Sequence, residues 1–164
     1  MAKRLAVAGA VVAVLSLLIS LMVPAMADKR FVTRTLRLVD RAADDQGHYI
    51  DVNVAAKAFP RIGDYFVVSR DSLFVAGSGR RAGSYSGDCT LTVFDREQGP
   101  VEAECDLSFH IKGGLITAEG ALNFIEGPRK LAITGGTGKY KTAQGQITPQ
   151  DRPNATIFVF ELLL

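Results

Sequence analysis

The chain has 164 residues, of which 48% are apolar and 22% charged, and this composition is typical of one globular domain rather than of a disordered chain. Its formal net charge of +2 comes from Lys3 and Arg4, because the rest of the chain carries 17 basic and 17 acidic side chains. This balance leaves no basic stripe and argues against a nucleic-acid-binding surface.

Residues 1–27 have the layout of a secretory signal. A basic pair is followed by an apolar run over residues 5–23, and residues 24–27 end in small side chains at the positions that a signal peptidase reads. The apolar run is also long enough to cross a membrane as a helix. We therefore expect residues 28–164 to form a domain outside the cytoplasmic membrane, either secreted after cleavage or membrane-anchored by an uncleaved N-terminal helix.

The remainder reads as short extended segments separated by glycine-rich, proline-rich and acidic turns. The segments are rich in Val, Ile, Phe, Thr and Tyr, the residues that favour strands. No helical period stands out among them. The predicted strands are Arg30–Val39, Tyr49–Ala56, Asp64–Leu73, Gly87–Phe94, Glu102–Ile111, Leu115–Phe124, Lys130–Thr134, Lys139–Ile147 and Thr156–Leu163.

Eight or nine short strands at this spacing predict an all-β barrel or sandwich. The 137 residues from Asp28 onwards are enough for a closed antiparallel β-barrel of about eight strands. The interior of such a barrel holds side chains or one small ligand.

The pair Gly113–Gly114 predicts a two-residue hairpin turn, because both positions can take positive φ. This turn pairs Ile111 with Ile116 and Phe109 with Ala118. Apolar side chains then share one face, and polar ones, including His110, share the other. A shift of one residue would mix the two faces.

A second hairpin, turning near Glu97, places Phe94 opposite Pro100 and Leu91 opposite Ala103. The same register sets Cys89 opposite Cys105 on the inner face. In an exported domain such a pair favours a disulfide. The alternative is two free cysteines packed as small apolar groups.

The sequence gives little support for a metal, phosphate or cofactor site. The Thr134–Gly138 segment resembles a phosphate loop, but the residues after it read as a strand rather than a helix, which favours a tight hairpin. Neither His48 nor His110 has a second metal ligand at useful spacing. The acidic cluster of Asp40, Asp44 and Asp45 is interpreted as a solvated loop. We expect no metal and no cofactor.

The segment Leu131-Ala-Ile-Thr-Gly-Gly-Thr-Gly138, followed by Ala143-Gln-Gly-Gln-Ile147, resembles the signature of the allene oxide cyclase and dirigent barrels. The upstream segments Gly63–Asp64, Gly87–Leu91 and Ile116–Gly120 occur in the family order. The similarity spans residues 63–164. It implies an eight-stranded barrel with an apolar cavity, often assembled as a homodimer or homotrimer. Plant members guide the cyclisation or coupling of reactive intermediates, and bacterial relatives include polyketide cyclases and exported proteins.

The resemblance also places individual residues. Cys89 matches a cavity cysteine of the allene oxide cyclases. Leu122 lies where those enzymes have a tyrosine, Val67 where they have a proline, and Arg37 near their buried glutamate. The expected cavity residues are Tyr65, Val67, Cys89, Leu91, Phe109, Leu122 and Phe124.

Two functions follow from these residues. The first is a cofactor-independent cyclase or isomerase acting on an apolar small molecule, as in polyketide cyclisation or cycloaddition during natural-product biosynthesis. Its candidate polarising residues are Arg37, Asp51 and Asn53, each of which also fits a solvated outer face. The alternative is an exported dirigent-like barrel that binds a lipophilic ligand without catalysis.

Overall fold

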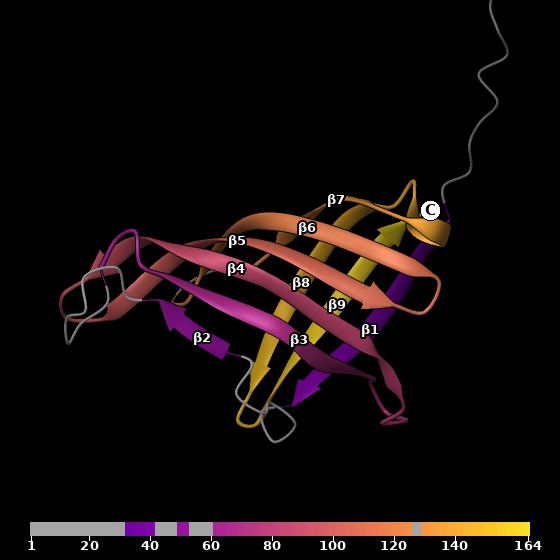
Figure 1. The fold of residues 1–164 in the computed structure, drawn as a ribbon, viewed down its shortest axis with the longest axis horizontal. Coiled ribbons are helices and arrows are strands. Elements are labelled where there is room, and N and C mark those ends of the chain that lie inside the picture. Colours follow the sequence, from indigo (N-terminus) through magenta and orange to yellow (C-terminus); the bar gives the residue numbers. More distant parts are fainter. Residues whose placement is uncertain (1–31, 42–48, 53–60, 126–128) are drawn as a thin grey trace, which may run out of the picture. The chain divides into compact units, whose positions relative to one another are not determined.

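A computed structural model describes residues 32–41, 49–52, 61–125 and 129–164. The predicted signal segment and Asn53 lie outside these residues. The described part consists of antiparallel strands and one short 3₁₀ turn (Figure 1). The strands are β1 (Thr33–Arg41), β2 (Tyr49–Val52), β3 (Tyr65–Val75), β4 (Arg81–Asp95), β5 (Gly99–Ile111), β6 (Gly114–Asn123), β7 (Leu131–Gly136), β8 (Gln144–Arg152) and β9 (Ala155–Leu163), and η2 (Gly138–Tyr140) precedes β8.

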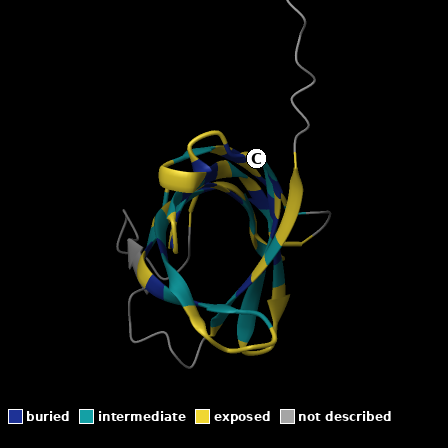
Figure 2. Cartoon of the chain, turned by 90° about the vertical axis from the view of Figure 1, so that its right-hand side faces the viewer, coloured by how far each residue is buried: buried dark blue, intermediate teal, exposed yellow. Residues whose placement is uncertain are grey.

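The strands form one sheet that closes on itself. Their order is β1-β9-β8-β7-β6-β5-β4-β3-β2, and β1 also pairs with β3, so eight strands form a ring and β2 extends one edge of β3. Figure 2 looks along the barrel and shows the strands arranged as a closed ring. The predicted all-β barrel of about eight antiparallel strands is therefore confirmed.

The closing seam is short. Residues Leu38–Asp40 of β1 face Leu73–Val75 of β3, and β2 occupies the same edge of β3 at Tyr65–Val68. Strand β3 thus changes its neighbour along its length, from β2 at its start to β1 at its end.

Alternating side chains explain why these segments form half-buried strands. In β5, Cys105, Leu107 and Phe109 are buried, whereas Glu104 and Asp106 are exposed. This alternation places the apolar face of each strand inside the barrel and the polar face in solvent.

The turn between β5 and β6 lies one residue earlier than predicted, which shifts the pairing partners on β6 by two residues. Ile111 pairs with Gly114 and Phe109 with Ile116, so the turn is Lys112–Gly113. Gly114 is needed for a different reason: a Cβ there would lie 2.1 Å from the carbonyl oxygen of Thr137. Because the shift is an even number of residues, the predicted inner and outer faces are still correct.

The predicted strand Lys139–Ile147 was wrong in its first half. Residues Gly138–Tyr140 form η2, whose turn is closed by the Tyr140 N–H donating to Thr137 O at 3.0 Å. The Lys139 N–H donates to Gly113 O at 3.0 Å, which holds η2 against the β5–β6 turn. Strand β8 begins only at Gln144 and continues to Arg152.

Candidate functional site

The inner face of the barrel is a single apolar core with a polar group at its edge. Its largest fully buried side chains are Phe109, Phe160, Leu38, Leu73, Ile116, Leu131 and Ile147. One charged residue, Asp71, is buried among the described residues, with 3% of its surface exposed.

Asp71 lies directly opposite Tyr85 in the β3–β4 pairing, so both side chains point to the same face of the sheet. Tyr85 is 7% exposed, and its hydroxyl donates a hydrogen bond to Asp40 Oδ2 at 2.8 Å. Asp40 is two residues beyond the buried Leu38 on β1 and pairs with Leu73 of β3 across the seam. Three strands thus bring two carboxyl groups and one phenol to the inner face. These side chains, of Asp40, Asp71 and Tyr85, form the polar group.

A β-bulge determines which way Asp71 points. Val68 pairs with Gly87 and Asp71 with Tyr85, so β3 advances three residues where β4 advances two. The extra residue lets Val68 and Asp71 both face inward despite their odd spacing. Arg70, in the bulge, has φ of 60°, and it is the one non-glycine residue with positive φ in the described ranges.

The polar group rests on an aromatic cluster. The Tyr85 ring lies parallel to Phe109, with centroids 5.7 Å apart, and meets Phe158 edge-on at 5.1 Å. Phe109 in turn contacts Phe158 and Phe160 edge-on. Such contacts fix the ring of Tyr85, and therefore the direction of its hydroxyl. Because Asp40 is only half-buried, the polar group lies between the packed rings and solvent.

The predicted disulfide is confirmed. Cys89 of β4 is bonded to Cys105 of β5, with Cα atoms 4.0 Å apart, and the two residues are directly opposed as the hairpin register required. Both cysteines are buried on the inner face, four residue pairs along the β4–β5 ladder from Tyr85 and Phe109.

The structure brings together only part of the predicted cavity. Cys89, Leu91, Phe109 and Leu122 are buried in the barrel. Phe124 follows the last residue of β6 and is 39% exposed.

Tyr65 and Val67 face the other way. They pair with Thr90 and Asp88, on the opposite face of β4 from Cys89, and Tyr65 is 38% exposed. The alternation along β3 instead turns Phe66 and Val68 inward: Val68 belongs to the apolar core, and the partly buried Phe66 packs against it.

Of the three residues suggested as polarising groups, Arg37 is not at the site. Arg37 is exposed on β1 opposite Val159 of β9. Asp51 lies on β2, paired with Phe66 of β3. Asn53 is outside the described residues.

Two of the residues that meet inside the barrel, Asp40 and Tyr85, were missed because the strands that contain them were predicted too short. The predicted first strand ended at Val39, which left Asp40 in a solvated loop, whereas β1 continues to Arg41. The strand predicted to start at Gly87 begins at Arg81, and this extension adds Tyr85 to the inner row of Cys89. The signal for Asp71 was the odd spacing between the apolar positions Val68 and Leu73, which requires a bulge.

No cluster of His, Cys, Asp or Glu side chains within the described ranges could hold a metal ion. Among the same residues no helix has the length and apolarity needed to span a membrane.

Solved structures share this fold. A pyocyanin demethylase is 23% identical with a TM-score of 0.59, covering 79% of this chain and 99% of its own. An exo-specific intermolecular Diels-Alderase is 17% identical with a TM-score of 0.58, covering 80% and 96%. A pterocarpan synthase dirigent protein is 15% identical with a TM-score of 0.60, covering 82% and 94%. A comparison with curated proteins finds no match.

The model of the allene oxide cyclase barrel like domain matches residues 40–158, from the Asp40 of the polar group to the Phe158 of the aromatic cluster. The fold and this match together show that the chain belongs to the allene oxide cyclase-like barrel family.

Proposed function

We propose that the barrel is a cofactor-independent cyclase or isomerase that acts on an apolar small molecule, and that Asp40, Asp71 and Tyr85 are its reacting groups. The observation that carries the proposal is the convergence of two carboxyl groups and a phenol on an otherwise apolar inner face. Solved structures of the same fold are named for demethylation, cycloaddition and cyclisation, which supports a reaction on a small molecule.

The two carboxyl groups have different surroundings, and this difference suits them to opposite roles. Asp71 is almost fully buried, and burial disfavours the charged form of a carboxyl group. Asp40 is half-buried and accepts a hydrogen bond from Tyr85, which favours its charged form. Neighbouring carboxyl groups with opposed environments are a common arrangement for an acid and a base.

An isomerisation at this site would proceed by two coupled proton transfers. Asp71 gives its proton to a carbonyl oxygen of the substrate, and Asp40 removes a proton from the adjacent carbon. The electron pair of the broken C–H bond forms the carbon–carbon double bond of an enol. In a substrate with a β,γ double bond this enol is a dienol. Asp40 returns its proton to the γ carbon, and the enol hydroxyl returns the other proton to Asp71. The double bond thereby moves into conjugation with the carbonyl, and both carboxyl groups are restored.

Cyclisation needs less from the same residues. A hydrogen bond from neutral Asp71 to a carbonyl oxygen polarises an attached double bond, and binding at the apolar face of the barrel favours a folded conformation of the substrate chain. In this case no net proton transfer takes place.

The test compares two aspartate variants of the full chain on a panel of polyenes that carry a conjugated carbonyl, with products separated by chiral chromatography. Asp71→Asn removes the acid, and we expect turnover to fall about 100-fold or more. Asp106→Asn, on the exposed face of β5, is the matched control and should keep full turnover. No turnover above the uncatalysed rate by the folded wild-type protein on any member of the panel would refute the enzyme.

The alternative, a barrel that binds a lipophilic ligand without catalysis, is favoured by two other observations. Leu122 is buried where the allene oxide cyclases have a tyrosine, and Arg37 is exposed near the position of their glutamate. The hydroxyl and the acid of those enzymes are therefore missing at these two positions. Native mass spectrometry of protein purified from its source separates the functions, because a co-purified lipid that is not converted supports binding alone. The same spectrum tests the predicted homodimer or homotrimer.

We also propose that the domain is exported, since a disulfide in a small barrel is typical of an oxidising compartment. Fractionation of the source cells followed by N-terminal sequencing tests this location. It distinguishes a secreted protein that starts near Asp28 from one that keeps residues 5–23 as a membrane tether.

A further inference from the structure

We propose that the outer wall of the barrel carries a second site, a pocket that binds a phosphate group. The pocket has a volume of about 410 Å³ and is lined by Arg70, Arg81, Ser84 and His110. It is separate from the inner polar group, because Ser84 and His110 lie on the face of β4 and β5 opposite to Tyr85 and Phe109.

Three neighbouring strands supply the lining. Arg70 comes from β3, Arg81 and Ser84 from β4, and His110 from β5. Ser84 and His110 are directly opposed in the β4–β5 pairing, and Ser84 is also opposed to Ser72 of β3. Ser84 and His110 therefore lie at regularly paired positions of the sheet, whereas Arg70 lies in the bulge of β3 and Arg81 beside a second register shift.

The lining has the chemistry of an anion site. Two guanidinium groups offer planar pairs of N–H donors that match the oxygens of phosphate, and the serine hydroxyl and the imidazole add further donors. Among the described residues, no carboxylate lines the pocket. The exposed acids on the same strands, Asp88 and Asp106, are four residues from Ser84 and His110, a separation of about 13 Å along a strand.

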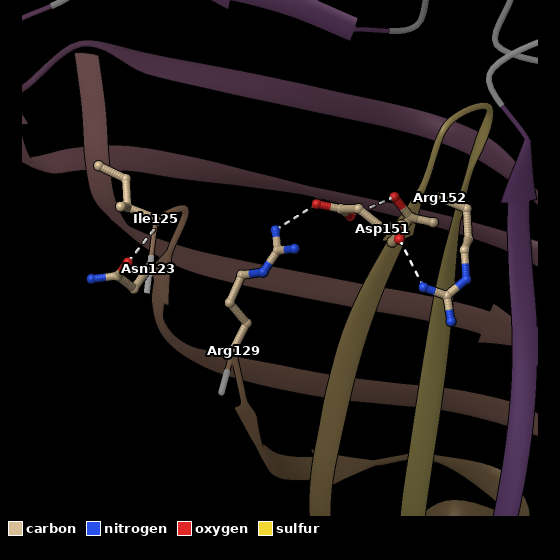
Figure 3. Close-up of polar contacts among 6 residues, drawn as sticks. Asn123, Ile125, Arg129, Asp151 and Arg152 are labelled. Carbon is tan, nitrogen blue, oxygen red and sulfur yellow. Dashed lines mark hydrogen bonds and ion pairs between the residues drawn. The ribbon is translucent and has the colours of Figure 1, made fainter. Parts of the chain in front are cut away.

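Three other arginines of the described ranges have side-chain partners that these two lack. Arg129 forms an ion pair with Asp151 at 2.6 Å, and Arg152 donates to the carbonyl oxygen of Asp151 (Figure 3). Arg41 lies over the ring of Phe74 at 4.6 Å. For Arg70 and Arg81, no carboxylate of the described chain lies within ion-pair distance.

The backbone of Arg70 is the second observation. Its φ of 60° is unfavourable for a residue with a Cβ, and its N–H is held by Ser86 Oγ at 2.9 Å. A glycine would adopt this conformation without strain, so retaining arginine here has a conformational cost. A role for the guanidinium in ligand binding would explain why the bulge carries this residue.

The experiment follows the ring resonances of His110 by NMR in the full chain, with His48→Gln used to assign them. Inorganic phosphate is titrated at constant pH and ionic strength, and a second titration uses vesicles of phosphatidylcholine with and without phosphatidic acid. We expect a saturable shift of the His110 resonances and an affinity about tenfold lower in Arg81→Gln, as for the loss of one charge-assisted hydrogen-bonded pair. Arg80→Gln removes a neighbouring exposed arginine that does not line the pocket, and should leave the affinity within about twofold.

The two titrations identify the source of the phosphate. A response to inorganic phosphate that depends on Arg81 supports a free anion or phosphoester. A response only to vesicles that contain phosphatidic acid supports a lipid headgroup. Equal losses in Arg80→Gln and Arg81→Gln would show that only the overall charge attracts the anion and would overturn the site, as would the absence of a response to either probe.

Discussion

The hydroxyl of Tyr85 donates to Asp40 Oδ2 at 2.8 Å across 45 residues of sequence, and so connects β4 to β1 inside the barrel. Neither strand pairs with the other, because β3 lies between them at the seam. The contact therefore reports both on the shape of the inner face and on the closure of the ring.

Replacing Tyr85 by Phe tests this contact while keeping the aromatic cluster. The variant loses one hydrogen bond to a carboxyl group, so we expect its free energy of unfolding to fall by about 1–3 kcal/mol. Tyr85→Leu also loses the ring contacts with Phe109 and Phe158, so its free energy of unfolding should be lower still. Urea denaturation measures both. A Phe variant as unstable as the Leu variant would mean that the hydroxyl contributes little beyond the ring.

The bulge in β3 makes opposite predictions for two adjacent residues. Arg70→Gly relieves a positive φ, and we expect the free energy of unfolding to stay the same or to rise by up to about 1 kcal/mol. Ser69→Gly, where the backbone has no such strain, should lower it by about 0.5–1 kcal/mol. Thermal unfolding of the two variants checks the sign. Equal destabilisation would contradict a strained conformation at Arg70.

The disulfide should contribute strongly to stability. It joins residues 16 apart in sequence, for which the loss of chain entropy in the unfolded state predicts about 3 kcal/mol. The double variant Cys89→Ala/Cys105→Ala should therefore unfold at a lower urea concentration than the oxidised wild type. Reduced wild-type protein serves as the control and should resemble the double variant. If reduction leaves the midpoint unchanged, the covalent bond is not what stabilises the hairpin.

Alanine substitutions at two glycines distinguish the effect of close packing on stability from the effect of backbone conformation. Gly114→Ala would place a Cβ 2.1 Å from the Thr137 oxygen, so the loop before η2 must move away, and we expect a loss of about 3 kcal/mol or more. In Gly77→Ala nothing lies within 4 Å of the new Cβ. The free energy of unfolding should therefore fall by only about 1–2 kcal/mol, because the residue must keep a φ of +83°. Similar losses at both positions would show that positive φ, and not contact with Thr137, explains Gly114.

The fold was predictable because its strongest signals are local. Alternation within β5 fixed the faces, turn residues separated the strands, and the opposed Cys89 and Cys105 fixed one hairpin register. The β5–β6 register was not predictable to the residue, because Gly113 and Gly114 offer two acceptable turns. The choice between them depends on Thr137, which approaches from a distant part of the chain.

The candidate site was not predictable in the same way, because it depends on irregularities that alternation cannot show. A bulge between Val68 and Asp71 changes which residues of β3 point into the barrel. Residues at strand ends, such as Asp40, are predicted as loop from the sequence alone, because nothing in the sequence shows that the neighbouring strand extends beside them. The family resemblance drew attention to Tyr65 and Val67, whose side chains the structure turns to the outer face.

The seam between β1 and β3 has a consequence for folding. Only three residue pairs close the ring, and Asp40 belongs to one of them. Asp40 lies beside Tyr85 because β1 pairs with β3, so the polar group is complete only when this seam is closed. A ligand that bridged Asp40 of β1 and Asp71 of β3 would stabilise the pairing of these two strands. At a concentration one hundred times its dissociation constant, it would stabilise the folded chain by about 2.7 kcal/mol. Binding of the ligand and closure of the ring would then be thermodynamically coupled.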